Sequence, residues 1–184
     1  NIYAIFGTSD PMIGSMSIPP AYHIPGIFGS NIGGISSEYY RFNVDSEYDS
    51  WLTIGLTDGD PDNKLASIGI DFDLWTINDA LHITNGAVFV MDPEKKVING
   101  DEYTIGQLTI PNSLKREVIV NVQGKKNGGN SWTQTGINFQ LQRPKLLDPN
   151  QVPRDCKTWY DGCNTCSVRD GLLGGCTKIM CFRE

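Results

Sequence analysis

Short apolar runs that alternate with polar residues dominate the middle of this 184-residue chain, and clusters of Gly, Asn, Asp and Pro separate them. A period of two is typical of half-buried strands, and Asp-Gly or Asn-Gly between two runs favours a tight turn. The pattern predicts an all-β fold, an antiparallel β-sandwich of the Ig-like or jelly-roll type. Seven strands are predicted at residues 39–44, 50–56, 67–72, 87–91, 103–110, 116–122 and 135–141, with one weak helical candidate at 74–83. The expected core between the two sheets is Trp51, Ile54, Ile68, Ile70, Phe89, Ile119 and Phe139.

The five cysteines are crowded near the end of the chain, and none precedes Cys156. Such crowding predicts a small module held by disulfides and made in an oxidising compartment, so we expect a secreted, extracellular protein. The expected disulfide residues are Cys156, Cys163, Cys166, Cys176 and Cys181. Five cysteines allow two disulfides and one unpaired cysteine in fifteen arrangements. Alternatively, the last four of them can supply thiolates to zinc.

The first residues are apolar and β-like, and a segment with three prolines follows them. Proline favours extended backbone, so we expect residues 1–29 to form an extended arm with a stiff connector. A sandwich over 30–143, a proline-rich linker over 144–155 and a cysteine module over 156–184 follow. The arm residues expected to make assembly contacts are Ile2, Tyr3, Ile5, Phe6, Met12, Ile13, Met16 and Ile18. In the alternative interpretation, the arm is the first strand of its own sandwich.

The chain carries a net charge of −6, and its carboxylates are concentrated between Glu38 and Asp79. This balance argues against nucleic-acid binding and against a basic membrane-surface patch, and no apolar stretch is long enough to span a bilayer. Within the acidic stretch, oxygen ligands occur at alternate positions, as in loops that bind Ca²⁺. The candidate calcium ligands are Asp58, Asp60, Asp62 and Asn63. An ordinary solvated turn explains the same residues equally well.

Signals for catalysis are weak. Asp71 and Asp73 have the spacing of one strand face and resemble a glycosidase pair, although any solvent-facing strand shows the same alternation. His23 and His82 are the only histidines, and the sequence contains neither a nucleophile elbow nor a phosphate-binding loop. The sequence therefore predicts a protein that is not an enzyme.

Sugar could be attached or bound. No Asn-x-Ser/Thr sequon occurs, and only Asn164-Thr165-Cys166 fits the rare Asn-x-Cys variant, so attached glycans would be mainly O-linked. A set of aromatic residues could stack on sugars, although core packing explains most of them equally well. These residues are Tyr39, Tyr40, Tyr48 and Trp132.

Four segments carry a resemblance to known proteins. They are Pro20-Ala-Tyr-His-Ile-Pro-Gly26, Asp45-Ser-Glu-Tyr-Asp-Ser-Trp-Leu-Thr-Ile-Gly55, Asn85-Gly-Ala-Val-Phe89 and Trp159-Tyr-Asp-Gly-Cys-Asn-Thr-Cys166. Over nearly its whole length, the chain resembles secreted proteins of algae and related protists, an uncharacterised family similar to subunits of extracellular glycosylated fibrils. The resemblance implies a structural polymer and transfers no catalytic residues.

The sequence thus predicts a structural subunit of an extracellular filament, a homopolymer whose identical subunits join head to tail. Each subunit would donate its N-terminal β-arm to an open sheet edge of its neighbour, since unpaired strand edges accept an added strand. A contact of this kind does not close on itself. The alternative function is a calcium-assisted carbohydrate-binding module with glycan partners.

Overall fold

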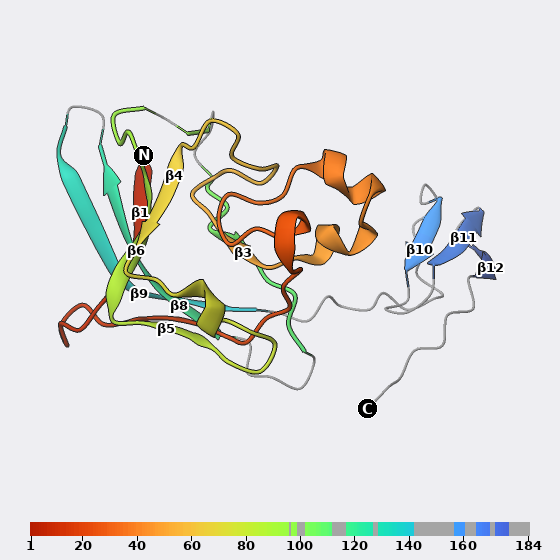
Figure 1. Cartoon of the computed structure of the whole chain (residues 1–184), viewed down its shortest axis with the longest axis horizontal. Helices are drawn as coiled ribbons and strands as arrows, with labels where there is room; N and C mark the ends of the chain where they lie inside the picture. Colours follow the sequence, from red (N-terminus) through yellow and green to blue (C-terminus); the bar gives the residue numbers. More distant parts are fainter. Residues whose placement is uncertain are drawn as a thin grey trace. The chain divides into compact units, whose positions relative to one another are not determined.

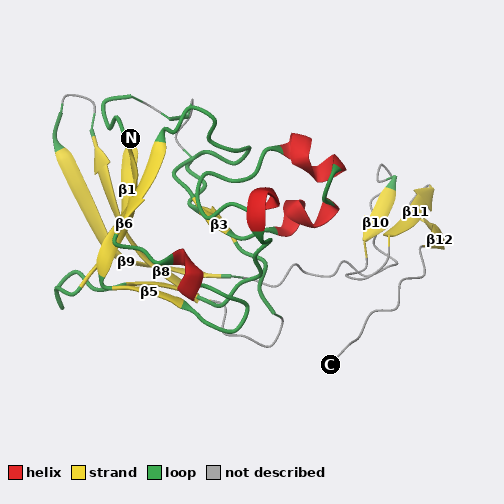
Figure 2. Ribbon diagram, viewed as in Figure 1, coloured by secondary structure: helices red, strands yellow, loops and turns green. Residues whose placement is uncertain are grey.

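The computed structural model describes residues 1–95, 97–98, 102–111, 117–126, 129–141, 157–160, 165–169 and 172–176. The chain divides into two compact units, Asn1–Leu141 and Gln142–Glu184. The described residues form strands and four short 3₁₀ helices, with no α-helix among them, as Figures 1 and 2 show. None of these helices has the length or apolar character needed to cross a bilayer. The prediction of an all-β, antiparallel fold is confirmed.

One curled antiparallel sheet forms the frame of the first unit. Its strands are β1 (Ile2–Thr8), β2 (Met16–Ile18), β4 (Leu65–Ile68), β5 (Leu81–Ile83), β6 (Asn85–Val90), β8 (Glu117–Lys125) and β9 (Ser131–Gln140). The strand order is β4-β6-β1-β8-β2-β5, and β9 pairs with β8. Both β1 and β2 pair with β8, and they continue outward to β6 and β5 respectively. In the sheet, β1 and β2 therefore occupy the place of one long, interrupted strand, and β6 and β5 occupy the place of a second.

Smaller elements lie beside this sheet. Strand β3 (Trp51–Leu52) pairs with β7 (Gly106–Gln107), and the 3₁₀ helices are η1 (Gly26–Phe28), η2 (Ser37–Arg41), η3 (Val44–Tyr48) and η4 (Phe72–Leu74). Figure 1 shows η1 to η3, in orange, gathered at the end of the unit away from β1. The second unit contains a separate sheet of β10 (Thr158–Tyr160), β11 (Thr165–Arg169) and β12 (Leu172–Cys176), in that order.

The core of the first unit lies against one face of the curled sheet. Its fully buried apolar side chains include Ile5 of β1, Met16 and Ile18 of β2, Val88 of β6 and Val120 of β8. Because the sheet curls over its own core, a second large sheet is not required to cover it. The predicted sandwich of two facing sheets is not confirmed.

A buried polar side chain joins the central strands. Asn121 of β8 is 0% exposed; its Nδ2 donates to the carbonyl oxygens of Phe6 (3.1 Å) and Gly14 (2.8 Å). Its Oδ1 accepts from the backbone N–H of Gly136, at 2.9 Å, where the β8–β9 pairing has a bulge. Asn121 therefore links the backbone of β1, of the connection after it and of β9 at the point where the ladders are interrupted.

Several sequence predictions are corrected by this fold. Residues 39–44 belong to η2, the connection after it and η3, because the side chains of Ser36 and Asn43 cap these turns. Residues 74–83 contain the end of η4 and strand β5 rather than an α-helix. Two predicted core residues, Ile68 and Phe139, are 66% and 41% exposed. Where apolar residues occupy successive positions of a strand, the sequence does not show which face is buried. In β4 the buried face is the one opposite Ile68.

The largest correction concerns the N-terminus. Residues 2–8 are an interior strand of their own sheet, paired with β6 on one side and β8 on the other. The extended arm is therefore not confirmed. The alternative interpretation is confirmed in that β1 pairs within its own chain, although in a curled sheet and not in a sandwich. The physical reason is burial, since detaching β1 would expose Ala4 and Ile5 and leave two rows of backbone groups unpaired.

Candidate functional site

A cavity of about 370 Å³ opens in the first unit, between the segment that follows β2 and helix η4. This volume lies in the range typical of small-molecule sites. Its lining combines ring, carboxylate and amide side chains with loop backbone: His23, Ile24, Pro25, Gly26, Gly29, Ser30, Asn31, Asp49, Phe72, Asp73 and Trp75.

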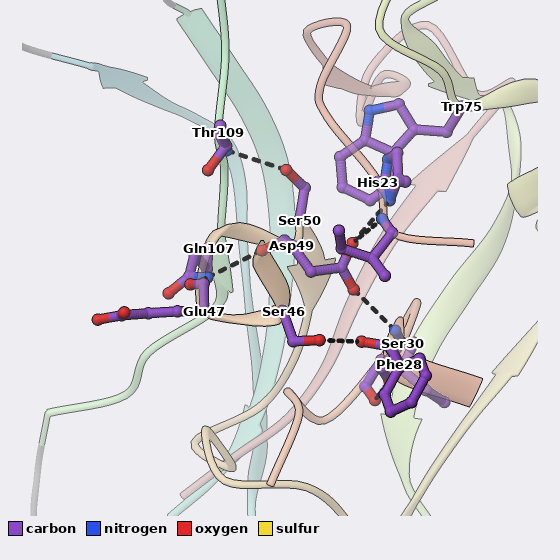
Figure 3. Close-up of polar contacts among 12 residues, drawn as sticks. His23, Phe28, Ser30, Ser46, Glu47, Asp49, Ser50, Trp75, Gln107 and Thr109 are labelled. Atoms are coloured by element: carbon purple, nitrogen blue, oxygen red, sulfur yellow. Dashed lines mark hydrogen bonds and ion pairs between the residues drawn. The ribbon is translucent and has the colours of Figure 1, made fainter. Parts of the chain in front are cut away.

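The carboxylate of Asp49 organises one wall of this cavity. Asp49 is 0% exposed, and its two oxygens accept from the backbone N–H groups of Ile24 (2.8 Å) and Ser30 (2.7 Å), as Figure 3 shows. Ile24 lies in the proline-rich segment that was predicted to be a stiff connector, and Ser30 is the first residue after it. Asp49 thus fixes this segment against the body, because a buried carboxylate is stable only when hydrogen bonds replace its water.

Further hydrogen bonds hold the segment that carries Asp49. Gln107 of β7 donates through Nε2 to the carbonyl oxygens of Glu47 (2.9 Å) and Asp49 (2.8 Å). The hydroxyl of Ser50 accepts from the N–H of Thr109, at 2.9 Å. Figure 3 shows these contacts on the side of Asp49 away from His23. The wall is therefore rigid and set by residues distant in sequence.

His23 lies between Asp49 and Trp75. Its Nδ1 is 3.7 Å from Oδ1 of Asp49, and its ring meets the ring of Trp75 edge to face, with centroids 4.4 Å apart. Trp75 is itself fixed, because its Nε1 donates to the carbonyl oxygen of Pro19 at 2.9 Å. Nε2 of His23 is buried and has no hydrogen-bond partner within the described part of the chain.

Burial shifts the titration of both groups. Desolvation lowers the pKa of His23, although the nearby carboxylate of Asp49 and a hydrogen bond to the backbone of Ser50 act in the opposite direction. Desolvation raises the pKa of Asp49, offset by its backbone hydrogen bonds and by His23. Compared with exposed groups of the same kinds, burial therefore favours the uncharged form of His23 and the uncharged form of Asp49.

The accessible part of the cavity is suited to a small polar ligand. Asn31 and Asp73 are exposed at its rim and Phe72 is half-buried, so amide, carboxylate and ring surfaces are all available. Trp75 is only 2% exposed and supports the site without offering a stacking surface. The oxygens of Asp49 are occupied by backbone donors, so this carboxylate shapes the cavity.

The predicted assembly residues are separated by the fold. Ile2, Tyr3, Ile5 and Phe6 lie on β1, whereas Met16 and Ile18 are fully buried on β2. Between the strands, Ile13 is half-buried and Met12 is 90% exposed. The connector after β2 is tied down by hydrogen bonds from the N–H groups of Ala21 and Tyr22 to the carbonyl oxygens of Thr76 and Thr109.

The predicted calcium ligands make separate contacts. Oδ1 of Asp58 accepts from the N–H of Ser37, and both oxygens of Asp60 accept from the chain at 64–65. Asp62 forms a surface ion pair with Lys64 at 2.8 Å, and Asn63 has the positive φ of a turn residue. No group of three or more His, Cys, Asp or Glu residues is placed to hold a metal in the described residues.

The remaining candidates lie apart from one another. Asp71 caps η4 by accepting from the N–H of Asp73, so these two carboxylates lie at a turn rather than on one strand face. His82 is exposed on β5. Among the aromatic residues, Tyr39, Tyr40 and Tyr48 belong to η2 and η3, whereas Trp132 of β9 packs against the core.

In the second unit, Cys166 of β11 and Cys176 of β12 are directly opposite in the strand register. Cys156, Cys163 and Cys181 lie outside the described residues. The predicted disulfides are thus not confirmed, but two of the five positions are placed.

Sequence reasoning missed Asp49 and Asn121. A buried acidic residue gives no signal in a stretch where carboxylates are frequent, and Asn121 interrupts the apolar run 118–122 at one position only. That interruption is the one signal that could have indicated a buried hydrogen-bonding role.

Comparison of the chain with protein-family models finds no match, and neither does comparison with curated proteins or with solved structures. Function must therefore be argued from the residues themselves.

Proposed function

We propose that this chain is a structural subunit of an extracellular filament in which β1 of one copy occupies the position between β6 and β8 of the next. The observation that carries the proposal is the place of β1, which forms ladders on both sides and is followed by a connection that can serve as a hinge. Exchange of such a strand between copies preserves the ladders with β6 and β8 and changes only which copy supplies them. The turn bonds from Ile13 and Gly14 to Asp10 in the connection open when it extends. A head-to-tail exchange then extends without closing.

The exchanged segment is shorter than the arm predicted from the sequence. Residues 19–24 are held by the body through the bonds of Pro19, Ala21, Tyr22 and Ile24, so β2 stays in its own sheet. The hinge is the connection 9–15, at which Met12 is exposed. Fully extended, seven residues span about 23 Å, enough for β1 to reach a neighbour that lies against the first unit.

A second feature supports contact between copies. Large apolar side chains are exposed on η1 to η3 and beside them, within a short stretch of sequence. These residues are Ile27, Tyr39, Phe42, Val44 and Tyr48. Exposed apolar side chains gathered on neighbouring elements are typical of interaction sites, and η1 to η3 lie at the end of the unit away from β1 (Figure 1).

A pair of engineered cysteines tests the exchange. Phe6 and Ala87 are Cα partners in the β1–β6 ladder, and both are half-buried, so F6C with A87C places two thiols within disulfide range. In assembled material, exchange gives oxidised chains linked into a ladder on a non-reducing denaturing gel. The native chain, run beside them, shows any links that its own cysteines make.

The matched control joins strands that stay in one chain in either state. Ala66 of β4 and Phe89 of β6 are Cα partners, so A66C with F89C gives monomers only. If F6C with A87C also gives monomers only, or if electron microscopy of the native protein shows no filaments, the exchange proposal is rejected.

The cavity favours a second function, binding of a carbohydrate. Half-buried Phe72 contributes apolar surface to the lining, and Asn31 and Asp73 offer hydrogen-bonding groups, a combination suited to a sugar. N31A with D73A should abolish retention on glycan resins, whereas exposed Asp45, outside the cavity lining, provides the control D45A. If N31A with D73A is retained as well as D45A, the cavity is excluded as the carbohydrate-binding site.

Calcium binding by Asp58, Asp60 and Asp62 stays a prediction, tested by whether a chelator lowers the melting temperature.

A further inference from the structure

In the second unit, the backbone register of two strands places two cysteines directly opposite each other. Cys166 and Cys176 are Cα partners in the antiparallel β11–β12 pair. Directly opposite residues in such pairs have Cα atoms about 4.5 or 5.5 Å apart, depending on the hydrogen-bonding position. Both values fall within the range of about 4.4–6.8 Å found across disulfides. The backbone therefore meets the distance condition for a bond between these residues.

Local sequence explains why this register is specified. Strand β11 ends at Arg169 and β12 begins at Leu172, so only Asp170 and Gly171 join them. Asp-Gly is a preferred dipeptide for a two-residue hairpin, and a short loop fixes the register of the strands it connects. The opposite positions of the two cysteines in the register therefore follow from the local sequence and do not depend on packing against distant residues.

A bulge completes the alignment. Val168 is opposite Leu173, but Cys166 is opposite Cys176, so β12 has one additional residue between these pairs. The residues there are Gly174 and Gly175, and glycine is the residue that bulges accommodate most readily. Without the bulge, Cys166 would be opposite Gly175.

We propose that Cys166 and Cys176 form a disulfide that joins β11 to β12. Each thiol loses one proton and one electron as the bond between the two sulfur atoms forms, and a small disulfide such as oxidised glutathione is reduced to two thiols in exchange. A unit of about 40 residues has a small core, and units of this size usually depend on such bonds. The inference does not rest on the proposed filament.

This bond reduces the fifteen arrangements open from the sequence to three. Cys156, Cys163 and Cys181 remain, of which two can pair and one stays available for a link to another chain. The bond also excludes a zinc site that uses both Cys166 and Cys176 as thiolates.

Peptide mapping of the full chain tests the proposal. Free thiols are alkylated, and the protein is then digested with trypsin without reduction. Cleavage after Lys157, Arg169 and Lys178 gives peptide 158–169, which contains Cys163 and Cys166, and peptide 170–178, which contains Cys176. We expect these two peptides as one linked species, lighter than their sum by two hydrogen atoms, and fragmentation should place the link on Cys166.

Serine variants provide the matched pair. C163S should retain the linked species, and C166S should lose it. A link through Cys163, a link from Cys176 to a peptide containing Cys156 or Cys181, or alkylation of both Cys166 and Cys176 overturns the proposal. If C166S does not accumulate, the fragments of the native chain and of C163S still decide between the two cysteines.

Discussion

At the scale of single residues, the buried side chain of Asn121 is expected to contribute strongly to the stability of the interrupted sheet. Replacing it by alanine removes one part-buried hydrogen bond each from the carbonyl oxygens of Phe6 and Gly14 and from the N–H of Gly136. One such hydrogen bond contributes about 0.5–1.5 kcal/mol to stability. We expect N121A to lower the free energy of unfolding by about 1.5–4.5 kcal/mol, the contribution of three such bonds, measured by urea denaturation.

Asn138 on the neighbouring strand is the control for this prediction. Its side chain donates to Glu117 and accepts from Gln140, but it lies on the exposed surface of β9. N138A should change stability by less than about 0.5 kcal/mol, as surface substitutions usually do. Equal losses in the two variants would contradict the role assigned to Asn121.

His23 gives the first unit a dependence on pH with a definite sign. Its pKa in the folded protein lies below the ordinary value of 6.5, so the unfolded chain binds the proton more readily. Stability is therefore highest above pH 6.5 and falls as the pH decreases through 6.5 towards the lowered pKa. H23F should flatten this decline in urea midpoints measured across that window, and H82Q, at an exposed position, should retain it.

Asp49 acts in the opposite direction at lower pH. Its pKa is raised above the ordinary value of 3.8, so the folded state binds this proton more readily, and stability increases as the pH falls from the raised pKa towards 3.8. The decline caused by His23 should therefore level off in acid. In D49N the levelling should disappear, although the variant is less stable throughout because an amide NH₂ cannot accept the hydrogen bond that a carboxylate oxygen accepts.

At the scale of elements, the two interrupted strands meet where glycines allow close approach. Gly7 of β1 is the Cα partner of Gly86 of β6, and a Cβ on Gly7 would collide with the backbone of Ile83 and Met16. G7A should lower the free energy of unfolding by about 1–3 kcal/mol or more, because backbone cannot move aside as a side chain can. Thermal unfolding measures the loss, and T8S at the next, half-buried position, which keeps the hydroxyl that accepts from the N–H of Asp10, should change little.

These elements also show what the sequence alone could predict. Strand segments and turns were largely recognisable, because 67–72, 87–91, 116–122 and 135–141 each overlap an observed strand. The buried face was not, since apolar residues on both faces of β6 and β8 remove the alternation that would identify it. The cavity was also beyond prediction, because Asp49 acts through the backbone of Ile24 and Ser30, in and just after a segment whose prolines suggested an extended connector. Hydrogen bonds between a side chain and the backbone produce no periodic sequence pattern from which they could be predicted.

At the scale of the whole molecule, the chain is two units with separate sheets. Strands β1 to β9 lie within Asn1–Leu141 and β10 to β12 within Gln142–Glu184, and no described ladder joins a strand of one unit to a strand of the other. All five cysteines belong to the second unit. The first unit therefore holds its fold through burial and hydrogen bonds, whereas the second is expected to depend on the redox state of its cysteines.

This division predicts different responses to a reductant. The urea midpoint of the first unit, followed through Trp51, Trp75 and Trp132, should be the same with and without dithiothreitol, and the same in a chain that ends at Leu141. Protection of backbone amides in β11 and β12 from hydrogen exchange should instead be lost on reduction, because the proposed Cys166–Cys176 bond restricts their unfolded states. A lower midpoint for the shortened or reduced chain would show that the first unit depends on the second. Such coupling would also mean that β1 cannot leave its own sheet without disturbing both units, so the same measurement sets a condition that strand exchange must meet.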